Sequence, residues 1–407
     1  MKKRYAIVGL GYRGTYMFLE PMHKKYQEVA QLVALCDSNR GRAALARERT
    51  GLDLPIYTDY QQMLAEVDCD TVIVSTPDFT HHKVILASLR SGKDVICEKP
   101  MTIFDDKCRE ILAAEKETGK KVTVTFNCRF HPYMTKIKEL VAKVGKTYSV
   151  ELDWYLDTVH GADYFRRWHR YLKKSGGLLL HKSTHHFDVI NWWLNSYPEE
   201  VSAFGTRRFY GPVRDKRGTR CLTCEYKDTC EFYWDIEEDP FYRQFYLEAE
   251  EEDNYIRDSC VFDESIDIYD SMAVNVKYQS GALLAYSLIA HSPYEGWNAS
   301  ISGTKGRMEV GEIYSGIGED DGCNHIKVYD RSGAQINYDI PKLKGSHGGA
   351  DDKLIRMLIK NDVEDDLGVL ASSMDGAMSL LIGAAANLSI AENQKVKIKD
   401  LLKHPQG

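Results

Sequence analysis

The N-terminal stretch is the feature that most constrains what this chain can fold into. A short apolar run, Tyr5 to Val8, predicts a buried strand and leads directly into Gly9, Gly11 and Gly14, spaced G-x-G-x-x-G before a helical segment. Such glycines allow a tight turn and a close backbone approach, and the first free N–H groups of the helix face an anion. Spaced glycines alone are weak evidence, since such turns are common. The order of strand, turn and helix favours a pyrophosphate site.

A carboxylate after the second predicted strand indicates which dinucleotide binds. Val29 to Cys36 is strand-like, and Asp37 follows at its C-terminal end, at the distance expected for this unit. A carboxylate there accepts hydrogen bonds from the adenosine ribose hydroxyls and repels a 2′-phosphate. The alternative is that Asp37 only begins a turn or caps the next helix. NAD is therefore favoured over NADP, although Arg40 leaves room for a phosphate.

Length and charge bound the class of protein. A chain of 407 residues suggests two domains with a large buried core. The net charge of −7 gives no electrostatic reason to bind nucleic acid or an anionic membrane. The N-terminus lacks the apolar stretch of a signal peptide, and we expect no run of transmembrane length. These features predict a cytoplasmic enzyme that binds neither nucleic acid nor membrane.

Strands and helices alternate through the first third of the chain, up to a strand at Lys121 to Phe126. This alternation predicts a parallel, doubly wound sheet of the Rossmann type over residues 1–126, with ligands at the carboxyl ends of the strands. Two predicted strand ends carry polar groups. Ser75-Thr76-Pro77 precedes His81-His82, and Glu98-Lys99-Pro100 places a cation at the next strand end.

With these motifs the chain resembles the glucose–fructose oxidoreductase and inositol dehydrogenase family (Gfo/Idh/MocA). The matching pieces are GLGYRG, Asp37, STPDFTHH, CEKPM and GGLLLHKSTHHFD, in a specific order over the first half of the chain. The resemblance implies that Lys99 contacts both cofactor and substrate and that the Lys99–Pro100 bond is cis. Otherwise Lys99 is an ordinary exposed lysine. The predicted cofactor-binding residues are Gly9, Gly11, Tyr12, Arg13, Gly14, Asp37, Arg40, Ser75, Thr76, Pro77, His81, Glu98 and Lys99.

The second domain is expected over residues 127–407. Strand-like segments flank the hairpin signal Gln279-Ser280-Gly281 and continue to about Val310, while Lys353 to Leu402 reads as mainly helical. These segments predict an α+β domain with a large, open, mostly antiparallel sheet. In the resembling family the open face forms the subunit contact, which implies a homo-dimer or homo-tetramer.

An aromatic and basic cluster at Tyr164 to Arg170 can hold a sugar by stacking and hydrogen bonding, or can be a structural surface cluster. We predict a small carbohydrate or polyol as the substrate. The predicted substrate-binding residues are Arg129, Tyr164, Arg167, Trp168, His169, Lys182 and His186.

The segment Gly176 to Trp193 carries the main catalytic signal. His181 and His185 share one face of a predicted helix, with Asp188 near it. The family usually has aspartate in place of His181 and glycine in place of Ser183. Oxidation of an alcohol needs a base near neutral pKa, which suits histidine. We predict His185 as the general base, Lys99 as the group that polarises the hydroxyl, and His181 as an assisting or substrate-binding residue.

The histidine at position 181 leaves other interpretations open, namely a subfamily with another substrate or a shifted proton relay through Lys182 or His186. A lone histidine on an apolar helix is more often a core residue than a catalyst, although several adjacent ionisable groups are hard to bury without a role. Asp188 is expected to orient a ring or cap a turn.

Four cysteines lie in an expected insertion at about residues 211–263. Cys221, Cys224 and Cys230 are spaced C-x2-C-x5-C, and Cys260 follows. In a reducing compartment this predicts a four-thiolate metal site, with structural zinc first and an iron–sulfur cluster as the alternative. The segment is polar, so a metal would hold it together.

The function that these features favour is an NAD-dependent oxidoreductase acting on a CH–OH group of a sugar, glycoside or polyol. A second hypothesis is that NAD stays bound and is recycled, so that transient oxidation allows elimination of a glycosidic bond. A third is a non-catalytic sensor of NAD or sugar.

Overall fold

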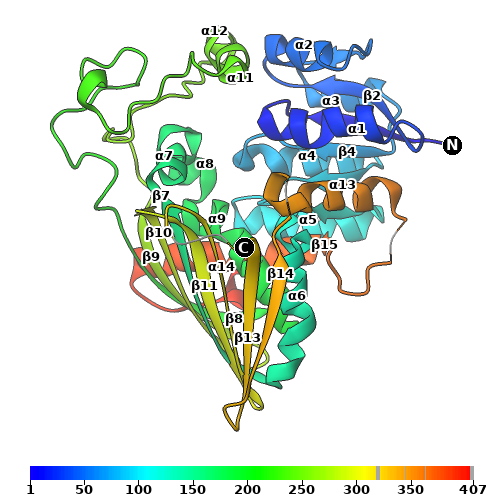
Figure 1. Ribbon diagram of the computed structural model, residues 1–407. Coiled ribbons are helices and arrows are strands. Elements are labelled where there is room, and N and C mark those ends of the chain that lie inside the picture. Colours follow the sequence, from blue (N-terminus) through cyan, green and yellow to red (C-terminus); the bar gives the residue numbers. More distant parts are fainter. Residues whose placement is uncertain (318–320, 344, 363, 404–407) are drawn as a thin grey trace.

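Two sheets organise the chain (Figure 1). The computed structural model describes residues 1–317, 321–343, 345–362 and 364–403. The first sheet has the strand order β15-β6-β5-β4-β1-β2-β3, in which β1 to β6 pair in parallel and β15 is antiparallel to β6. The order 3-2-1-4-5-6 is that of the doubly wound dinucleotide-binding fold, whose ligand crevice lies where the order reverses, beside β1. The predicted fold is confirmed.

The elements of this part lie close to their predicted positions. Its strands are Lys3–Val8 (β1), Ala30–Cys36 (β2), Ile56–Tyr57 (β3), Thr71–Val74 (β4), Asp94–Cys97 (β5) and Val122–Val124 (β6). Its helices are Arg13–Leu19 (η1), Glu20–Lys25 (α1), Arg40–Glu48 (α2), Tyr60–Glu66 (α3), Asp78–Arg90 (α4) and Asp105–Thr118 (α5).

The sequence explains these elements locally. All four residues of β4 are buried, as expected for a parallel strand covered on both faces. The helix α2 begins after Asn39, whose side chain accepts a hydrogen bond from the Arg42 N–H, and α5 ends at Gly119 in the left-handed conformation. The helix after the glycine turn starts as the π-helix η1. The Lys99–Pro100 bond is cis, as the resemblance implied.

The second sheet has the order β14-β13-β12-β11-β7-β10-β9-β8-β16, in which only β7 and β10 pair in parallel. This confirms the large, mostly antiparallel sheet. Its strands are Thr147–Asp157 (β7), Pro198–Thr206 (β8), Ser271–Tyr278 (β9), Leu283–Ser292 (β10), Glu295–Gly303 (β11), Gly306–Ser315 (β12), Cys323–Asp330 (β13), Gln335–Pro341 (β14) and Val396–Lys397 (β16).

Helices cover one face of this sheet. Residues along β9 alternate between buried and exposed, so one face of the strand is packed and the other is open. The helices of this part are Asn127–Phe130 (η2), Pro132–Leu140 (α6), Val141–Val144 (η3), Thr158–Arg166 (α7), Trp168–Arg170 (η4), Leu172–Ser175 (α8), Leu178–His181 (α9), Ser183–Leu194 (α10), Ser373–Glu392 (α14) and Ile398–Leu401 (α15).

The helix α14 is long and apolar enough to cross a membrane by length and composition, which differs from the expectation that no run reaches this length. Of its most apolar window, 61% is buried inside the protein. Ser379 contacts Thr184 of α10, and Ser389 accepts a hydrogen bond from the Ala203 N–H of β8. The apolar side chains of α14, such as Leu380, Leu381 and Ile382, belong to the main hydrophobic core of the protein.

Two late segments return to the N-terminal part of the chain. The strand Ala371–Ser372 (β15) extends the first sheet, and the helix Ala350–Lys360 (α13), preceded by Ser346–Gly349 (η7), buries Leu354 and Ile355 in the same apolar cluster as Ile7. Residues 127–407 therefore contribute to both sheets. In Figure 1, α13 lies beside the blue and cyan elements of the first sheet.

The insertion has its own short helices, which are Lys227–Thr229 (η5), Pro240–Tyr242 (α11), Arg243–Leu247 (η6) and Glu250–Asp253 (α12). It extends from the second sheet to the outer side of the first, where α11 and α12 lie next to α2 (Figure 1). Phe241 and Phe245 of the insertion belong to the apolar cluster that contains Ile7. The insertion thus connects the two parts of the molecule.

The predicted cysteine site is not formed. In the described part of the chain no group of three or more His, Cys, Asp or Glu side chains is placed to hold a metal ion, so Cys221, Cys224, Cys230 and Cys260 are not gathered. Instead Arg166 donates to the Cys221 thiol (3.1 Å). The insertion is also less polar than the sequence suggested, since Phe232, Ile236, Val261 and Phe262 are buried. Ion pairs of Arg220 with Glu250 and Asp258 add to this packing.

Candidate active site

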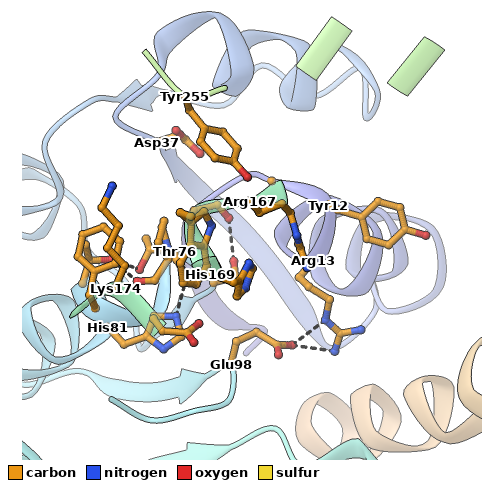
Figure 2. A pocket seen from close by; sticks show the side chains of 18 of the residues that line it. Tyr12, Arg13, Asp37, Thr76, His81, Glu98, Arg167, His169, Lys174 and Tyr255 are labelled. Atoms are coloured by element: carbon orange, nitrogen blue, oxygen red, sulfur yellow. Dashed lines mark hydrogen bonds and ion pairs between the residues drawn. The ribbon is translucent and has the colours of Figure 1, made fainter. Parts of the chain in front are cut away.

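A cavity of about 880 Å³ opens at the carboxyl ends of β1, β2, β4 and β5 and extends to the helices of the second part. Figure 2 shows side chains from its walls. Eleven of the predicted cofactor residues line it, and these are Gly9, Gly11, Tyr12, Arg13, Asp37, Ser75, Thr76, Pro77, His81, Glu98 and Lys99.

Gly14 and Arg40, which were also predicted to bind cofactor, are not among the lining residues. A Cβ atom on Gly14 would lie 2.0 Å from the Gly9 carbonyl oxygen, so Gly14 is required for the packing of the turn. Gly9 has φ +96°, and a Cβ there would lie 2.5 Å from the Ser75 backbone. Arg40 is exposed at the start of α2. Gly14 therefore has the packing role expected of the third glycine, whereas Arg40 does not line the cavity.

Asp37 is buried at the end of β2 and holds the glycine turn in place. Its carboxylate accepts hydrogen bonds from the Leu10 N–H (2.8 Å) and the Asn39 N–H (2.9 Å), and it forms an ion pair with Arg42 (3.2 Å). Asp37 therefore does more than begin a turn. The carboxylate stands at the edge of the cavity where an adenosine ribose binds in this fold.

Three other predicted residues are fixed by contacts between strand ends. The guanidinium of Arg13 donates to Glu98 (2.8 Å) and to Asp351 (3.3 Å), and the first pair is drawn in Figure 2. The ring nitrogens of His81 lie 2.8 Å from the Pro100 carbonyl oxygen and 2.7 Å from that of Thr76. These contacts tie the ends of β4 and β5 to the glycine turn.

Lys99 lies deep in the cavity. Its ammonium donates to the His181 carbonyl oxygen (3.1 Å) and lies 3.5 Å from Nε2 of the same residue. Burial lowers the pKa of Lys99 to about 8, although the nearby Asp78 carboxyl opposes this shift. Lys99 is therefore not an ordinary exposed lysine.

A buried Asp–His pair faces Lys99. Nδ1 of His181 lies 2.5 Å from Oδ2 of Asp78, the first residue of α4. Burial raises the pKa of Asp78 well above its usual value and lowers that of His181. Because Lys99 has only donors, the tautomer with the proton on Nδ1 allows His181 to donate to Asp78 and to present its Nε2 lone pair to Lys99.

His185 lies one turn further along the chain, but not on the same helix as His181. The predicted single helix is divided at Lys182 into α9 and α10. His185 nevertheless lines the same cavity, as does Lys182. Burial lowers the pKa of His185 well below the usual value, and Lys99 and Lys182 lower it further. Its buried Nδ1 has no hydrogen-bond partner among the described residues.

The predicted substrate-binding cluster lies at the end of the cavity that contains His181. Tyr164, Arg167, Trp168 and His169 line the wall. The His169 ring lies 4.1 Å from the His181 ring and stacks on Trp168 at 3.7 Å between centroids. Arg167 pairs with Asp163 at 2.7 Å. An aromatic ring, a guanidinium and imidazoles at one end of a cavity can bind hydroxyl groups and the apolar face of a sugar.

Two predicted substrate residues do not line this cavity. Arg129 donates to both carboxylate oxygens of Asp188, at 2.7 and 2.6 Å. His186 stacks on Trp154 at 3.7 Å between centroids and contacts the Tyr286 hydroxyl at 2.8 Å. Both predictions were wrong because each side chain is buried in a polar contact of the core. Asp188 likewise pairs with a guanidinium rather than orienting a ring.

We expect Asp188→Asn to lower the free energy of unfolding by about 3 kcal/mol, since the buried Arg129 guanidinium loses its bidentate carboxylate and keeps the Asp375 carboxylate at 3.4 Å. Denaturant unfolding followed by circular dichroism measures this. Asp362→Asn breaks a comparable bidentate pair, with Arg356 on the surface, and should cost no more than about 1 kcal/mol. Equal losses in the two variants would contradict the structural role of the buried pair.

The sequence interpretation missed several lining residues. Asp78, Asn127, His160, Asp163, Lys174 and His347 line the cavity, as do Tyr242, Tyr246, Asp253, Tyr255 and Arg257 of the insertion. Asp78 lies within the quoted motif STPDFTHH, so the motif was a usable signal. For the insertion residues no local signal exists, because the contacts join distant parts of the chain. The Tyr246 hydroxyl, for example, accepts from the Tyr12 N–H (3.3 Å).

The residues of this cavity fit a nicotinamide dinucleotide. The glycine turn before η1 provides a close backbone approach for a pyrophosphate, and Asp37 provides a ribose acceptor. Lys99, His181 and His185 lie at the other end of the same cavity. The fold and the site together define an NAD-binding oxidoreductase of the Rossmann class.

The chain belongs to the Gfo/Idh/MocA oxidoreductase family. The family model described as "Oxidoreductase family, NAD-binding Rossmann fold" matches residues 3–126, and the model described as "Oxidoreductase family, C-terminal alpha/beta domain" matches residues 138–398. The resemblance seen in the sequence motifs is confirmed.

Two relatives and one solved structure show what the chain is similar to. The "Putative oxidoreductase YteT" of Bacillus subtilis is 36% identical, over 98% of this chain and 98% of that protein. The 2,7-anhydro-N-acetylneuraminate hydratase of Mediterraneibacter gnavus is 29% identical over 49% of this chain and 52% of its own. The solved scyllo-inositol dehydrogenase of Lactobacillus casei, with NAD(H) and scyllo-inositol, shares the fold at a TM-score of 0.65 and 18% identity, over 98% of this chain and 100% of its own.

Proposed function

We propose that this protein is an NAD-dependent dehydrogenase that transfers hydride between a ring CH–OH carbon of a sugar, glycoside or polyol and the nicotinamide. The observation that carries the proposal is the meeting of Lys99, His181 and His185 at the end of a cavity whose other end holds Asp37 and the glycine turn. Bound NAD supplies the hydride acceptor. The polyol named for the solved scyllo-inositol dehydrogenase supports this substrate class.

The proposed roles of the residues follow from their surroundings. The depressed pKa keeps His185 unprotonated at neutral pH, so it can accept the hydroxyl proton. The Lys99 ammonium stabilises the developing alkoxide. His181 lies beside Lys99 and is oriented by Asp78, so we assign it an assisting role. Tyr164, Arg167, Trp168, His169 and Lys182 are the proposed substrate contacts.

Asp78 is a positioning residue in this proposal. Asp78→Asn removes the carboxylate that fixes the His181 tautomer, so we expect kcat to fall about 10- to 100-fold. The affinity for NADH should stay within about 3-fold, because Asp78 orients the ring rather than the cofactor. Steady-state kinetics and a fluorescence titration measure the two quantities. Asp59→Asn, at another lining position, is the control and should leave kcat unchanged. A parallel loss of cofactor affinity in Asp78→Asn would indicate a structural role instead.

A second candidate is a redox-neutral enzyme in which the cofactor stays bound and is recycled while a glycosidic bond is eliminated. The insertion supports this candidate, because its residues Tyr246 and Asp253 line the cofactor end of the cavity. A cofactor covered by these residues would stay bound between reaction cycles. The hydratase among the relatives is named for a reaction without net redox change.

Incubation of the purified protein with NAD and a panel of polyols, sugars and glycosides tests both candidates. Accumulation of NADH, followed by its absorbance, supports the dehydrogenase. Glycoside cleavage without net formation of NADH contradicts the dehydrogenase proposal and favours the recycling enzyme. Absence of both reactions, together with unchanged sugar affinity in Lys99→Ala and His185→Ala variants, favours the sensor.

Two further expectations stay predictions. We propose a homo-dimer or homo-tetramer that uses the open face of the second sheet, where Phe204 and Leu283 are 67% and 55% exposed. A cytoplasmic location is also a proposal. Metal analysis checks the correction made for the four cysteines, since a Cys224→Ser variant should hold no less metal than the wild type.

A further inference from the structure

We propose that Glu252 and Asp253, in the short helix α12 of the insertion, select NAD against NADP by placing negative charge where a 2′-phosphate would bind. The inference rests on the proposed use of a nicotinamide dinucleotide. It extends the role of Asp37 to residues more than 200 positions away in the chain, on an element outside the glycine motif.

Glu252 occupies the N-terminus of α2, the helix that directly follows Asp37. Its two carboxylate oxygens accept from the Gly41 N–H at 3.0 and 3.2 Å. Gly41 lies in the first turn of α2, where backbone N–H groups are without helical acceptors and attract anions. A Cβ on Gly41 would lie 2.8 Å from the Glu252 carboxylate, so a glycine permits this approach. A carboxylate of the insertion thus takes the position that an anionic ligand could use.

Asp253 acts on the neighbouring cation. An arginine close to the ribose carboxylate is the group that accommodates a 2′-phosphate in NADP-binding proteins of this fold. Arg42 is placed for that role, but its guanidinium is already engaged. It pairs with Asp37 (3.2 Å) and Asp253 (2.8 Å), and its Nε donates to the Phe245 carbonyl oxygen (3.1 Å).

The position of these contacts relative to the cavity links them to the cofactor. Asp37, Ser38, Arg42, Asp253 and Tyr255 all line the same end of the cavity wall. Asn39 donates to the Ala249 carbonyl oxygen (2.9 Å) and to Asp253 (3.2 Å), so α12 is fixed against the loop that follows β2.

The charges at this end therefore oppose a phosphate. Asp37 and Asp253 pair with the guanidinium of Arg42, and the Glu252 carboxylate is held at the backbone N–H of the neighbouring Gly41. A 2′-phosphate would meet an excess of negative charge and would find the Arg42 donors in use. A ribose 2′-hydroxyl carries no charge, so the same carboxylates are compatible with NAD.

The test is a titration of the full-length protein with NADH and with NADPH, followed by nicotinamide fluorescence. The wild type should bind NADH at least about 10-fold more tightly than NADPH. In the double variant Glu252→Gln/Asp253→Asn, NADPH affinity should rise by about 10-fold or more, while NADH affinity changes by less than about 3-fold. The matched control is Glu251→Gln, which removes the same charge from the next position of α12 and should not alter the ratio.

The outcomes separate this inference from the proposed function. A double variant with an unchanged NADPH to NADH ratio, or with equal losses for both cofactors, overturns the inference. So does a wild type that binds NADPH as tightly as NADH. A wild type that prefers NADH in the titration but oxidises no polyol or sugar leaves the inference standing and defeats the dehydrogenase proposal.

Discussion

The Lys99→Met variant is expected to lose about 10³-fold in kcat/KM, since removing one preorganised donor to a developing oxyanion has an effect of this size. The residue is half-buried at the end of β5, and its ammonium lies beside the His181 ring and carbonyl oxygen. Steady-state kinetics with the substrate found in the panel measures the loss.

The pH dependence of the wild type tests the same role. Burial lowers the pKa of Lys99 to about 8, so the ammonium is present below that pH and is lost above it. We expect the oxidation rate to fall as the pH rises through about 8. In Lys99→Arg this fall should disappear, because a guanidinium stays protonated, although the altered geometry should lower the rate.

Lys174→Met is the matched control for Lys99→Met. Lys174 also lines the cavity, but its ammonium lies over the Phe79 and Tyr171 rings rather than beside the histidines. We expect a loss of less than about 10-fold in this control. Equal losses in the two variants would mean that the general positive charge of the cavity matters, and not the placement of Lys99.

The His185→Asn variant is expected to lose about 10²- to 10⁴-fold in kcat, the range for loss of a general base. Asparagine keeps a polar side chain of similar reach but cannot accept the proton. NADH affinity should change little, because His185 is at the opposite end of the cavity from Asp37.

The wild-type rate should also persist to acidic pH. Burial and the nearby lysines lower the pKa of His185, so the ring stays unprotonated below the usual histidine pKa of about 6.5, and the rate should fall only at lower pH. His181→Asn is the comparison, with an expected loss of about 10- to 100-fold. A larger loss in His181→Asn than in His185→Asn would reassign the general base to the Asp78–His181 pair.

Much of the first sheet could be predicted from local patterns. The apolar runs of β1, β4 and β5 are buried over the lengths that their composition indicated. Asp37 and Lys99 could be identified because each directly follows such a strand, and strand ends converge in a parallel sheet. A position next to a strong local signal is therefore predictable.

The wrong predictions concern side chains whose partners are remote. Arg129 and His186 have the chemistry of substrate ligands, but a buried carboxylate and a stacked tryptophan hold them in the core. The spacing of the cysteines suggested a metal site, whereas aromatic packing and arginine pairs organise that segment. Residue type and spacing do not show which of two compatible partners a side chain meets.

The sequence by itself determined the doubly wound dinucleotide-binding fold, the glycine turn, Asp37 and Lys99, because these depend on patterns within about 30 residues. Only the tertiary structure decided that Asp78 meets His181, 103 positions away, and that Tyr246 meets Tyr12, 234 positions away. The physical reason is that such contacts form when separate elements pack together, and packing depends on the shape of the whole chain rather than on local periodicity.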